Sequence, residues 1–289
     1  MLRHAAAQIS AGHREERGPP AFALHSNAMA TQPEPLTGRR ALVTGSATGI
    51  GRATATRLAA DGAAVVINYV GPPDSANSAV GEIEAAGGRA VAIEADVSQE
   101  DQVVAMFASA SEQLGGPVDL LVNNAGIEKP FELVDMPLEE WNKVLAVNLT
   151  GAFLCSREAA RGMLGAGIPG AIVNVTSVHE VIPWPRFGHY CASKSGLKLF
   201  AQTIARELAP AGIRVVNVAP GAILTPINQD LIDHPDKRGE VEAEIPLGRT
   251  GTPEEIAAAI AWVAGPEAEY VVGSTLFVDG GMTLYPKFV

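Results

Sequence analysis

The stretch Thr44-Gly45-Ser46-Ala47-Thr48-Gly49-Ile50-Gly51 follows directly on a short apolar run and leads into a segment of helical composition. Glycine lets the backbone approach a ligand closely at a turn between a strand and a helix, and the helix N-terminus can bind a pyrophosphate. The spacing is Gly-x-x-x-Gly-x-Gly rather than the common Gly-x-Gly-x-x-Gly. The stretch therefore predicts a dinucleotide-binding turn after the first strand of an α/β sheet.

After this turn, short β-branched runs alternate with helix-like segments rich in Ala, Leu and charged residues. That alternation is typical of a parallel sheet with helices on both faces. We expect one α/β domain over residues 37–289, doubly wound and Rossmann-type, with a seven-stranded, mainly parallel sheet. The expected strands are 41–44, 64–69, 90–94, 120–123, 171–176, 214–218 and 275–278, and the expected helices are 50–61, 76–86, 100–114, 138–163, 190–209 and 253–263.

Residues 1–36 lack this alternation, because charged residues and prolines are scattered there among Ala, Ser and Gly without a period. No apolar run in this segment has the length of a secretory signal. We expect a disordered N-terminal extension. Met29 resembles a natural start site, which would make residues 1–28 dispensable.

The composition of the 289-residue chain, 47% apolar and 18% charged, is that of a folded protein. Its net charge of −11 argues against binding to nucleic acid or to an anionic membrane surface. The uncharged stretch 162–178 contains glycines, a proline and an asparagine and does not predict a membrane span. Two cysteines in a chain of this length favour a reducing compartment, so we expect a cytoplasmic protein.

Further motifs follow the glycine turn. Asp96-Val97 comes after the expected third strand, Asn123-Asn124-Ala125-Gly126 after the fourth, and Tyr190 opens a helix four residues before Lys194. Together these motifs resemble the short-chain dehydrogenase/reductase family, and the resemblance extends over about residues 38–286. It implies an oxidoreductase with a nicotinamide cofactor and a catalytic tetrad, which here consists of Asn148, Ser177, Tyr190 and Lys194.

The spacing of Tyr190 and Lys194 places both side chains on one helix face, one turn apart. An ammonium group favours phenolate over phenol, so we expect Lys194 to lower the pKa of Tyr190 toward the working pH. Tyr190 is then the acid/base group, and Ser177 can hydrogen-bond the reacting oxygen. The resemblance implies that Asn148 supports a water connecting Lys194 to solvent. We expect Cys191, Ser193 and Lys198, on the same helix, to be packing or surface residues.

The cofactor site is predicted around the strand ends. Asn68, at the end of the second strand, lacks the charge that would repel a 2′-phosphate, and Val70 stands where many relatives that use NADP have Arg. We therefore expect NAD and NADP both to bind, with a preference for NAD, and we assign no metal site. The cofactor-binding set is Gly45, Thr48, Gly49, Ile50, Gly51, Asn68, Asp96, Val97, Asn123, Ala125, Gly126, Tyr190, Lys194, Pro220 and Gly221.

Several segments outside these motifs are similar to bacterial glucose 1-dehydrogenases, namely 126–130, 177–185, 225–228 and 279–286. This similarity implies oxidation of the C1 hydroxyl of D-glucose, or of a similar aldose, to the lactone. Glu128, His179 and Asn228 would add hydrogen-bonding groups for a sugar beside Ser177 and Tyr190. The alternative is that Glu128 and His179 are loop-surface residues or pair with each other.

Two other functions stay open. A 3-oxoacyl-carrier-protein reductase, or another carbonyl reductase, would keep the fold and the tetrad, but an acidic carrier needs a basic docking surface and this chain is acidic. A nucleotide-sensing module without catalysis would not need an intact tetrad. The resemblance also implies a homotetramer in which the helices expected at 138–163 and 190–209 pack between subunits.

Overall fold

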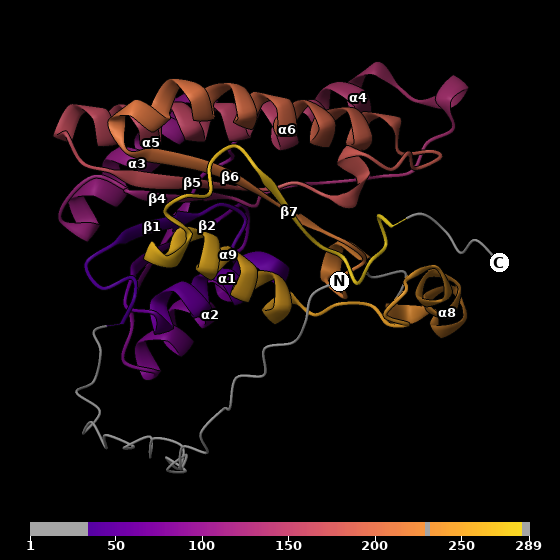
Figure 1. Ribbon diagram of the computed structural model, residues 1–289, viewed down its shortest axis with the longest axis horizontal. Helices are drawn as coiled ribbons and strands as arrows, with labels where there is room; N and C mark the ends of the chain where they lie inside the picture. Colours follow the sequence, from indigo (N-terminus) through magenta and orange to yellow (C-terminus); the bar gives the residue numbers. More distant parts are fainter. Residues whose placement is uncertain (1–33, 229–231, 285–289) are drawn as a thin grey trace, which may run out of the picture. The chain divides into compact units, whose positions relative to one another are not determined.

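The computed structural model describes residues 34–228 and 232–284. Its centre is a seven-stranded sheet in the order β3-β2-β1-β4-β5-β6-β7, with parallel pairing at every neighbouring strand (Figure 1). The prediction of a doubly wound α/β sheet is confirmed. The strands are β1 Arg40–Val43, β2 Ala64–Tyr69, β3 Arg89–Glu94, β4 Leu120–Asn123, β5 Gly170–Val175, β6 Ile213–Pro220 and β7 Thr275–Val278.

Helices cover both faces of this sheet. In Figure 1, α1, α2 and α9 lie on one face, and α3, α5 and α6 lie on the other. The apolar residues divide in the same way into two buried clusters, because a strand within a parallel sheet buries both of its faces. The helices are α1 Gly49–Ala60, α2 Asp74–Ala85, α3 Glu100–Leu114, α4 Leu138–Leu145, α5 Ala152–Ala166, α6 Gly188–Leu208, α8 Pro235–Glu244 and α9 Pro253–Ala264.

The single helix predicted over 138–163 is divided in the structure. A π-helical turn, Ala146–Gly151, separates α4 from α5. Gly151 packs against Val97, where an added Cβ would lie 2.9 Å from a side-chain carbon. The turn also places the tetrad residue Asn148 inside the protein, with 1% of its surface exposed. Such single π turns occur often at functional sites, and nothing in the local helical periodicity predicts one.

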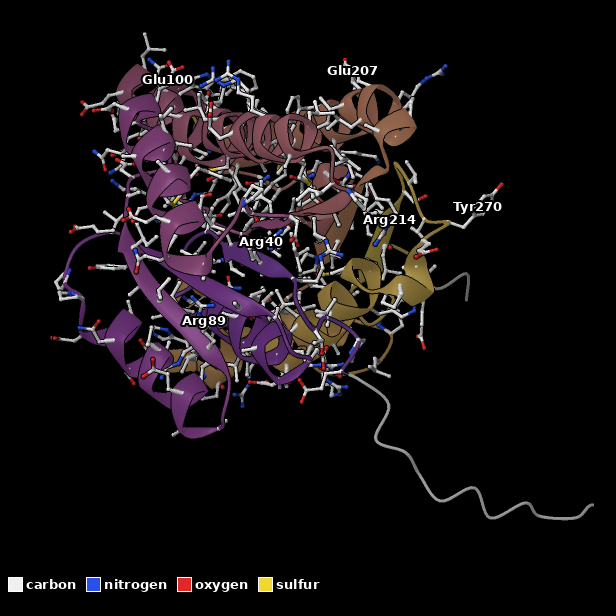
Figure 2. All side chains as sticks on the ribbon, turned by 90° about the vertical axis from the view of Figure 1, so that its left-hand side faces the viewer. Arg40, Arg89, Glu100, Glu207, Arg214 and Tyr270 are labelled. Atoms are coloured by element: carbon white, nitrogen blue, oxygen red, sulfur yellow. The ribbon has the colours of Figure 1, made fainter. Side chains whose placement is uncertain are left out.

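The ends of the sheet differ in chemistry. At the amino-terminal end, Asp119 forms ion pairs with Arg39 and Arg40, at 2.6 and 2.9 Å. Figure 2 shows Arg40 at this end, with Arg89 and Arg214 on the same side of the molecule. At the carboxyl-terminal end, β1 and β4 are neighbours whose following connections go to opposite faces. A ligand site is expected at such a switch point.

The first described residues, Glu34–Leu36, precede the domain boundary predicted at residue 37. Leu36 is 1% exposed, and its amide donates to the carbonyl of Asp61 at 2.8 Å. The remainder of the predicted extension, residues 1–33, lies outside the described residues. Among the described helices, none is both long and apolar enough to cross a bilayer.

Candidate active site

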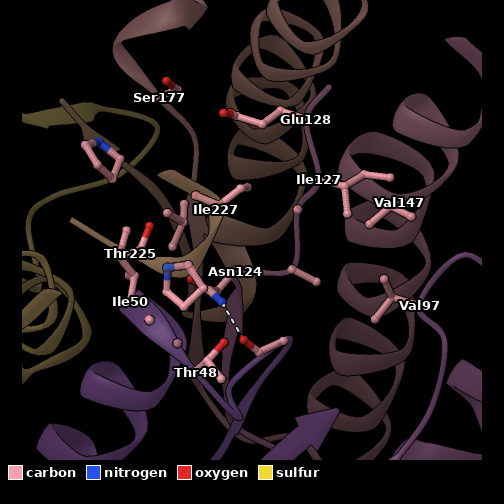
Figure 3. A pocket seen from close by; sticks show the side chains of 18 of the residues that line it. Thr48, Ile50, Val97, Asn124, Ile127, Glu128, Val147, Ser177, Thr225 and Ile227 are labelled. Atoms are coloured by element: carbon pink, nitrogen blue, oxygen red, sulfur yellow. Dashed lines mark hydrogen bonds between the residues drawn. The ribbon is translucent and has the colours of Figure 1, made fainter. Parts of the chain in front are cut away.

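A pocket of about 420 Å³ opens at the carboxyl-terminal ends of β1, β2, β4, β5 and β6. Figure 3 shows Thr48, Ile50 and Asn124 at one end of it and Glu128 with Ser177 at the other. The pocket contains most of the residues predicted from sequence to bind cofactor or substrate. These are Gly45, Thr48, Gly49, Ile50, Gly51, Asn68, Asp96, Val97, Ala125, Gly126, Glu128, Ser177, Tyr190, Lys194, Pro220, Gly221 and Asn228.

The glycine turn between β1 and α1 has a conformation that requires glycine. Gly45 and Gly49 have φ angles of +61° and +57°, which side chains disfavour. At Gly51, an added Cβ would lie 2.5 Å from the Asn124 Nδ2 atom and from the Gly45 carbonyl oxygen. The same Asn124 amide donates to the carbonyls of Thr44 and Gly45, at 2.9 and 3.1 Å. The turn is thus fixed to β4 and leaves its backbone facing the pocket.

The residues of this turn fit the pyrophosphate of a dinucleotide. The pocket meets the N-terminus of α1, where backbone amides and the helix dipole favour negative charge. Thr225 also lines the pocket; it is 5% exposed, and its hydroxyl has no hydrogen-bond partner among the described residues. A Cβ on Gly49 would lie 3.5 Å from this side chain. A buried, unpaired hydroxyl beside the glycine turn suits a polar ligand, and the sequence analysis did not single out Thr225.

Asn123, predicted to contact the cofactor, faces away from the pocket. Its amide donates to Asn174 Oδ1 and to Ser156 Oγ, both at 2.9 Å. Asn174 in turn donates to Asn217 Oδ1 at 3.2 Å, so buried amides connect β4, β5 and β6 in register. Asn123 is therefore not among the lining residues, whereas the next residue, Asn124, faces the glycine turn, because neighbouring side chains of a strand point to opposite faces.

Asn68 is at the pocket, but its amide holds the glycine turn. It is 1% exposed, its Oδ1 accepts from the Gly45 amide at 3.1 Å, and its Nδ2 donates to the Ala95 carbonyl at 3.0 Å. The side-chain amide therefore ties the glycine turn to the end of β3. Tyr69 and Val70, which also line the pocket, follow Asn68, and Val70 is 67% exposed.

Asp96 and Val97 lie on the wall of the pocket after β3. The Asp96 Oδ1 atom accepts from the amide and the hydroxyl of Ser98, at 2.9 and 2.7 Å. These bonds fix the turn between β3 and α3. Both residues line the pocket, and their contact with the cofactor stays a prediction.

Tyr190, Ser177 and Lys194 come together from α6 and the end of β5. The Lys194 Nζ atom lies 5.7 Å from the centre of the Tyr190 ring and donates to the Val175 carbonyl at 2.8 Å. Burial raises the pKa of Tyr190 well above its usual value, and the hydrogen bond with Ser177 offsets only part of this. Burial also lowers the pKa of Lys194 to about 8. The predicted lowering of the tyrosine pKa is wrong for the chain without ligands, because desolvation dominates.

Asn148 does not line the pocket, but it fixes the loop that does. Its side chain accepts from the Ile127 amide at 2.8 Å and donates to the Ile127 carbonyl at 3.0 Å. It also donates to the Ser193 hydroxyl at 3.1 Å, and Ser193 donates to the Tyr190 carbonyl at 2.7 Å. Ser193, which is fully buried, therefore connects Asn148 to the helix that carries Tyr190.

Glu128 directly follows Ile127 in this loop, and it also lines the pocket. Figure 3 shows its carboxylate on the same side of the pocket as Ser177. Burial raises the pKa of Glu128 to about 7, although the charge of Lys194 acts to lower it. At neutral pH this carboxyl is therefore divided between its neutral and ionised forms.

The other two predicted substrate residues are engaged with the protein. His179 stacks on Trp184 with ring centres 4.4 Å apart, its Nδ1 atom lies 3.1 Å from the Ile182 carbonyl, and it is not among the lining residues. Asn228 lines the pocket and donates through Nδ2 to the Ile223 carbonyl at 2.9 Å. The loop that follows thus holds His179 against Trp184, outside the lining of the pocket, and substrate contact by His179 stays a prediction.

Comparisons with known proteins agree with this fold. A family model described as enoyl-(acyl carrier protein) reductase matches residues 45–283. The chain is 49% identical to 3beta-hydroxysteroid dehydrogenase 1 of Eggerthella lenta over 88% of this chain and 97% of that protein. It is 43% identical to glucose 1-dehydrogenase 2 of Bacillus subtilis over 87% of this chain and 97% of that protein.

Solved structures give the same result. A putative gluconate dehydrogenase from Agrobacterium tumefaciens has a TM-score of 0.84 and 37% identity, over 88% of this chain and 99% of that one. A putative 2-deoxy-d-gluconate 3-dehydrogenase from the same organism, with bound NADP, has a TM-score of 0.80 and 34% identity, over 88% and 99%. The fold and pocket define a dinucleotide-dependent oxidoreductase. The chain belongs to the short-chain dehydrogenase/reductase family, as the sequence motifs predicted.

Proposed function

We propose that this enzyme oxidises the C1 hydroxyl of D-glucose, or of a similar aldose, to the lactone. The observation that carries the proposal is the pairing of Ser177 and Tyr190 with a carboxyl group, Glu128, across one end of the dinucleotide pocket. The similarity to the two glucose 1-dehydrogenases, 43% and 44% identical, supports an aldose as substrate. A bound nicotinamide dinucleotide would supply the hydride acceptor.

Tyr190 takes the proton of the reacting hydroxyl in this proposal. Burial keeps its phenol protonated in the ligand-free chain, so ionisation depends on a nearby positive charge. Lys194 carries that charge, with Nζ 5.7 Å from the ring centre. Ser177, which hydrogen-bonds Tyr190, holds the reacting oxygen beside the phenol.

Asn148 acts through position. By bonding both backbone groups of Ile127 and the Ser193 hydroxyl, it fixes the loop of Glu128 relative to α6. The bond to Lys194 through a water, which the family resemblance implies, is part of the proposal. An Asn148→Ala variant would then lose turnover more than cofactor binding.

The sugar itself would be held by acceptors. Ionised Glu128 can accept from two ring hydroxyls, and the side-chain oxygen of Asn228 offers another acceptor. His179 has no direct part, because the Ile182 carbonyl and the Trp184 ring occupy it. Recognition by one charged and one neutral acceptor favours polyols over simple alcohols.

A second candidate, a 3-hydroxysteroid, is favoured by the apolar wall of the same pocket. Ile127, Ile223 and Ile227 line it, and Ile227 is 46% exposed. The relative that is 49% identical is named a 3beta-hydroxysteroid dehydrogenase. A flat apolar ring system would cover this wall, whereas an aldose would leave it in contact with water.

The test is reduction of NAD and of NADP, each followed by absorbance, with D-glucose, xylose, galactose, a 3β-hydroxysteroid and a simple secondary alcohol. Rapid reduction with glucose supports the proposal. Turnover of the steroid but of no sugar would replace it with the second candidate. Oxidation of NADPH by a 3-oxoacyl thioester, without sugar or steroid turnover, would assign the enzyme to carrier-protein reduction, as in a relative from Synechocystis that is 42% identical.

We also propose that NAD and NADP both bind, with NAD preferred, since Val70 offers no cation to a 2′-phosphate.

We further propose that the enzyme is a homotetramer in the cytoplasm. Large apolar side chains lie exposed along α4, α5 and α6, and a second copy would cover them. They are Leu138, Phe153, Leu164 and Leu199. A monomer by light scattering at micromolar concentration would contradict this assembly.

A further inference from the structure

A second carboxylate, which the sequence analysis did not single out, is buried against α6, the helix that carries Lys194. Glu180 ends the short helix η3, Val178–Glu180, which directly follows Ser177. Its side chain is 0% exposed, and neither carboxylate oxygen accepts a hydrogen bond from any described residue. Glu180 does not line the pocket. Charged side chains are almost never buried in this way without a compensating charge.

Two side chains of α6 contact Glu180, and one of them carries the compensating charge. The Nζ atom of Lys198 lies 3.1 Å from Glu180 Oε1, and the hydroxyl of Ser195 donates to the Glu180 carbonyl at 3.1 Å. Lys198 is one helical turn beyond Lys194, so both ammonium groups lie on the same side of the helix. The Lys198 side chain is 28% exposed, whereas Lys194 is 4% exposed, so the inner lysine depends more on fixed charges.

We propose that Glu180 is a positioning residue that keeps Lys194 in its ammonium form and holds Ser177 against α6. Two carboxyl groups act on this lysine, Glu128 from the pocket and Glu180 from the interior, and both act against the lowering that burial causes. Glu128 is half-neutral near pH 7 and can be covered by substrate. Glu180 is fully buried and outside the pocket, so substrate cannot cover it.

The inference rests on the proposed role of Lys194, but its test needs neither cofactor nor substrate. Acetic anhydride acylates an amine only in its neutral form. The extent of Lys194 labelling is measured against pH by mass spectrometry of its peptide, and its midpoint reports the pKa of this lysine. In Glu180→Gln the midpoint should fall by about one pH unit, which is tenfold in the neutral fraction at fixed pH. In Lys198→Met the uncompensated carboxylate should move the midpoint upward.

Activity gives the second measurement. With whichever alcohol the enzyme turns over, the alkaline limb of kcat in Glu180→Gln should move to lower pH by the same amount as the labelling midpoint, while KM stays within about twofold. Glu180→Asp should restore part of both shifts, since it restores the charge.

A matched control is Glu158→Gln on α5. Glu158 is a half-buried carboxylate that pairs with Arg157 and Arg161 and does not line the pocket, so both midpoints should stay unchanged. Loss of thermal stability in Glu180→Gln with an unmoved labelling midpoint would overturn the proposal and leave Glu180 a structural residue. Should that variant not fold, Lys198→Met decides, and a midpoint that falls or stays unchanged overturns the proposal. Failure of the aldose assay alone would leave the labelling result standing.

Discussion

The two ends of the pocket are built in different ways. At the glycine turn the ligand would meet mostly backbone, fixed by the amides of Asn68 and Asn124 and by the absence of side chains at Gly45 and Gly51. At the other end it would meet ionisable side chains that burial pushes away from their usual pKa values. The glycine turn therefore depends on free space for the ligand, and the other end depends on the charges of its side chains. Substitutions in the turn should weaken cofactor binding, whereas substitutions at the ionisable end should reduce turnover.

The largest effect is expected at the ionisable end. Tyr190→Phe removes only a hydroxyl, so turnover should fall by about 10²- to 10⁴-fold, the usual contribution of a proton-transfer group. Cofactor binding, measured by fluorescence titration of reduced nicotinamide, should remain within about twofold. Tyr270→Phe is the matched control, because Tyr270 is fully exposed. Unchanged turnover in Tyr190→Phe would contradict the proposed mechanism.

A substitution in the glycine turn should weaken cofactor binding and lower stability. In Gly51→Ala the new Cβ would lie 2.5 Å from Asn124 Nδ2 and from the Gly45 carbonyl, so the turn must shift. We expect cofactor Kd to rise at least about tenfold and the free energy of unfolding to fall by about 1–3 kcal/mol. Titration calorimetry and urea denaturation measure the two effects.

Gly81→Ala is the control for that variant. Gly81 lies in α2 with no atom within 4 Å of an added Cβ, so alanine there should leave cofactor binding unchanged and stabilise the helix slightly. Equal effects of the two substitutions would show that Gly51 is not specially constrained.

A smaller effect, on the choice between NAD and NADP, is expected when a positive charge is added to the pocket wall after β2. Val70→Arg places a guanidinium at an exposed position of the pocket wall after β2. A charge-assisted hydrogen bond to a 2′-phosphate should shift the ratio of NADP to NAD affinity by about tenfold or more. Val104→Arg, an equally charged change at an exposed position of α3 outside the pocket, should leave the ratio unchanged. An unchanged ratio in Val70→Arg would place the 2′-phosphate elsewhere.

The last effect concerns Glu128 and develops only with pH. Its pKa is about 7 in the folded chain against 4.5 normally, so the unfolded chain releases this proton first and stability falls as pH rises from about 4.5 to 7. Glu128→Gln should remove this loss, which reaches at most about 3 kcal/mol above pH 7. The free energy of unfolding against pH, compared between variant and wild type, measures it.

The same substitution should act on substrate. KM for the sugar should fall through pH 7 in the wild type, as the carboxylate forms, and lose this inflection in Glu128→Gln. Glu132→Gln, at an exposed carboxylate paired with Arg186, is the control. A wild-type KM that does not vary around pH 7 would separate Glu128 from substrate binding.

Much of the fold follows from local pattern. The β-branched runs predict every strand of the sheet to within a few residues, because strands buried on both faces need continuous apolar sequence. The glycine spacing places one part of the pocket between β1 and α1. The Tyr190–Lys194 interval places another part near the start of α6. The split helix at Ala146–Gly151 and the inward direction of Asn123 were not predictable, since both depend on what packs from distant segments.

What the sequence by itself determined is therefore the class of sheet, the glycine turn and the set of chemical groups at the strand ends. Each depends on spacing within a few residues, which sets side-chain direction in a helix or a strand. Only the tertiary structure decided that the Asn68 amide bonds to the glycine turn, that His179 stacks on Trp184, and that Glu180 is buried beside Lys198. Those assignments depend on burial, because removing water from a group sets its partners and its charge, and burial is a property of the whole fold.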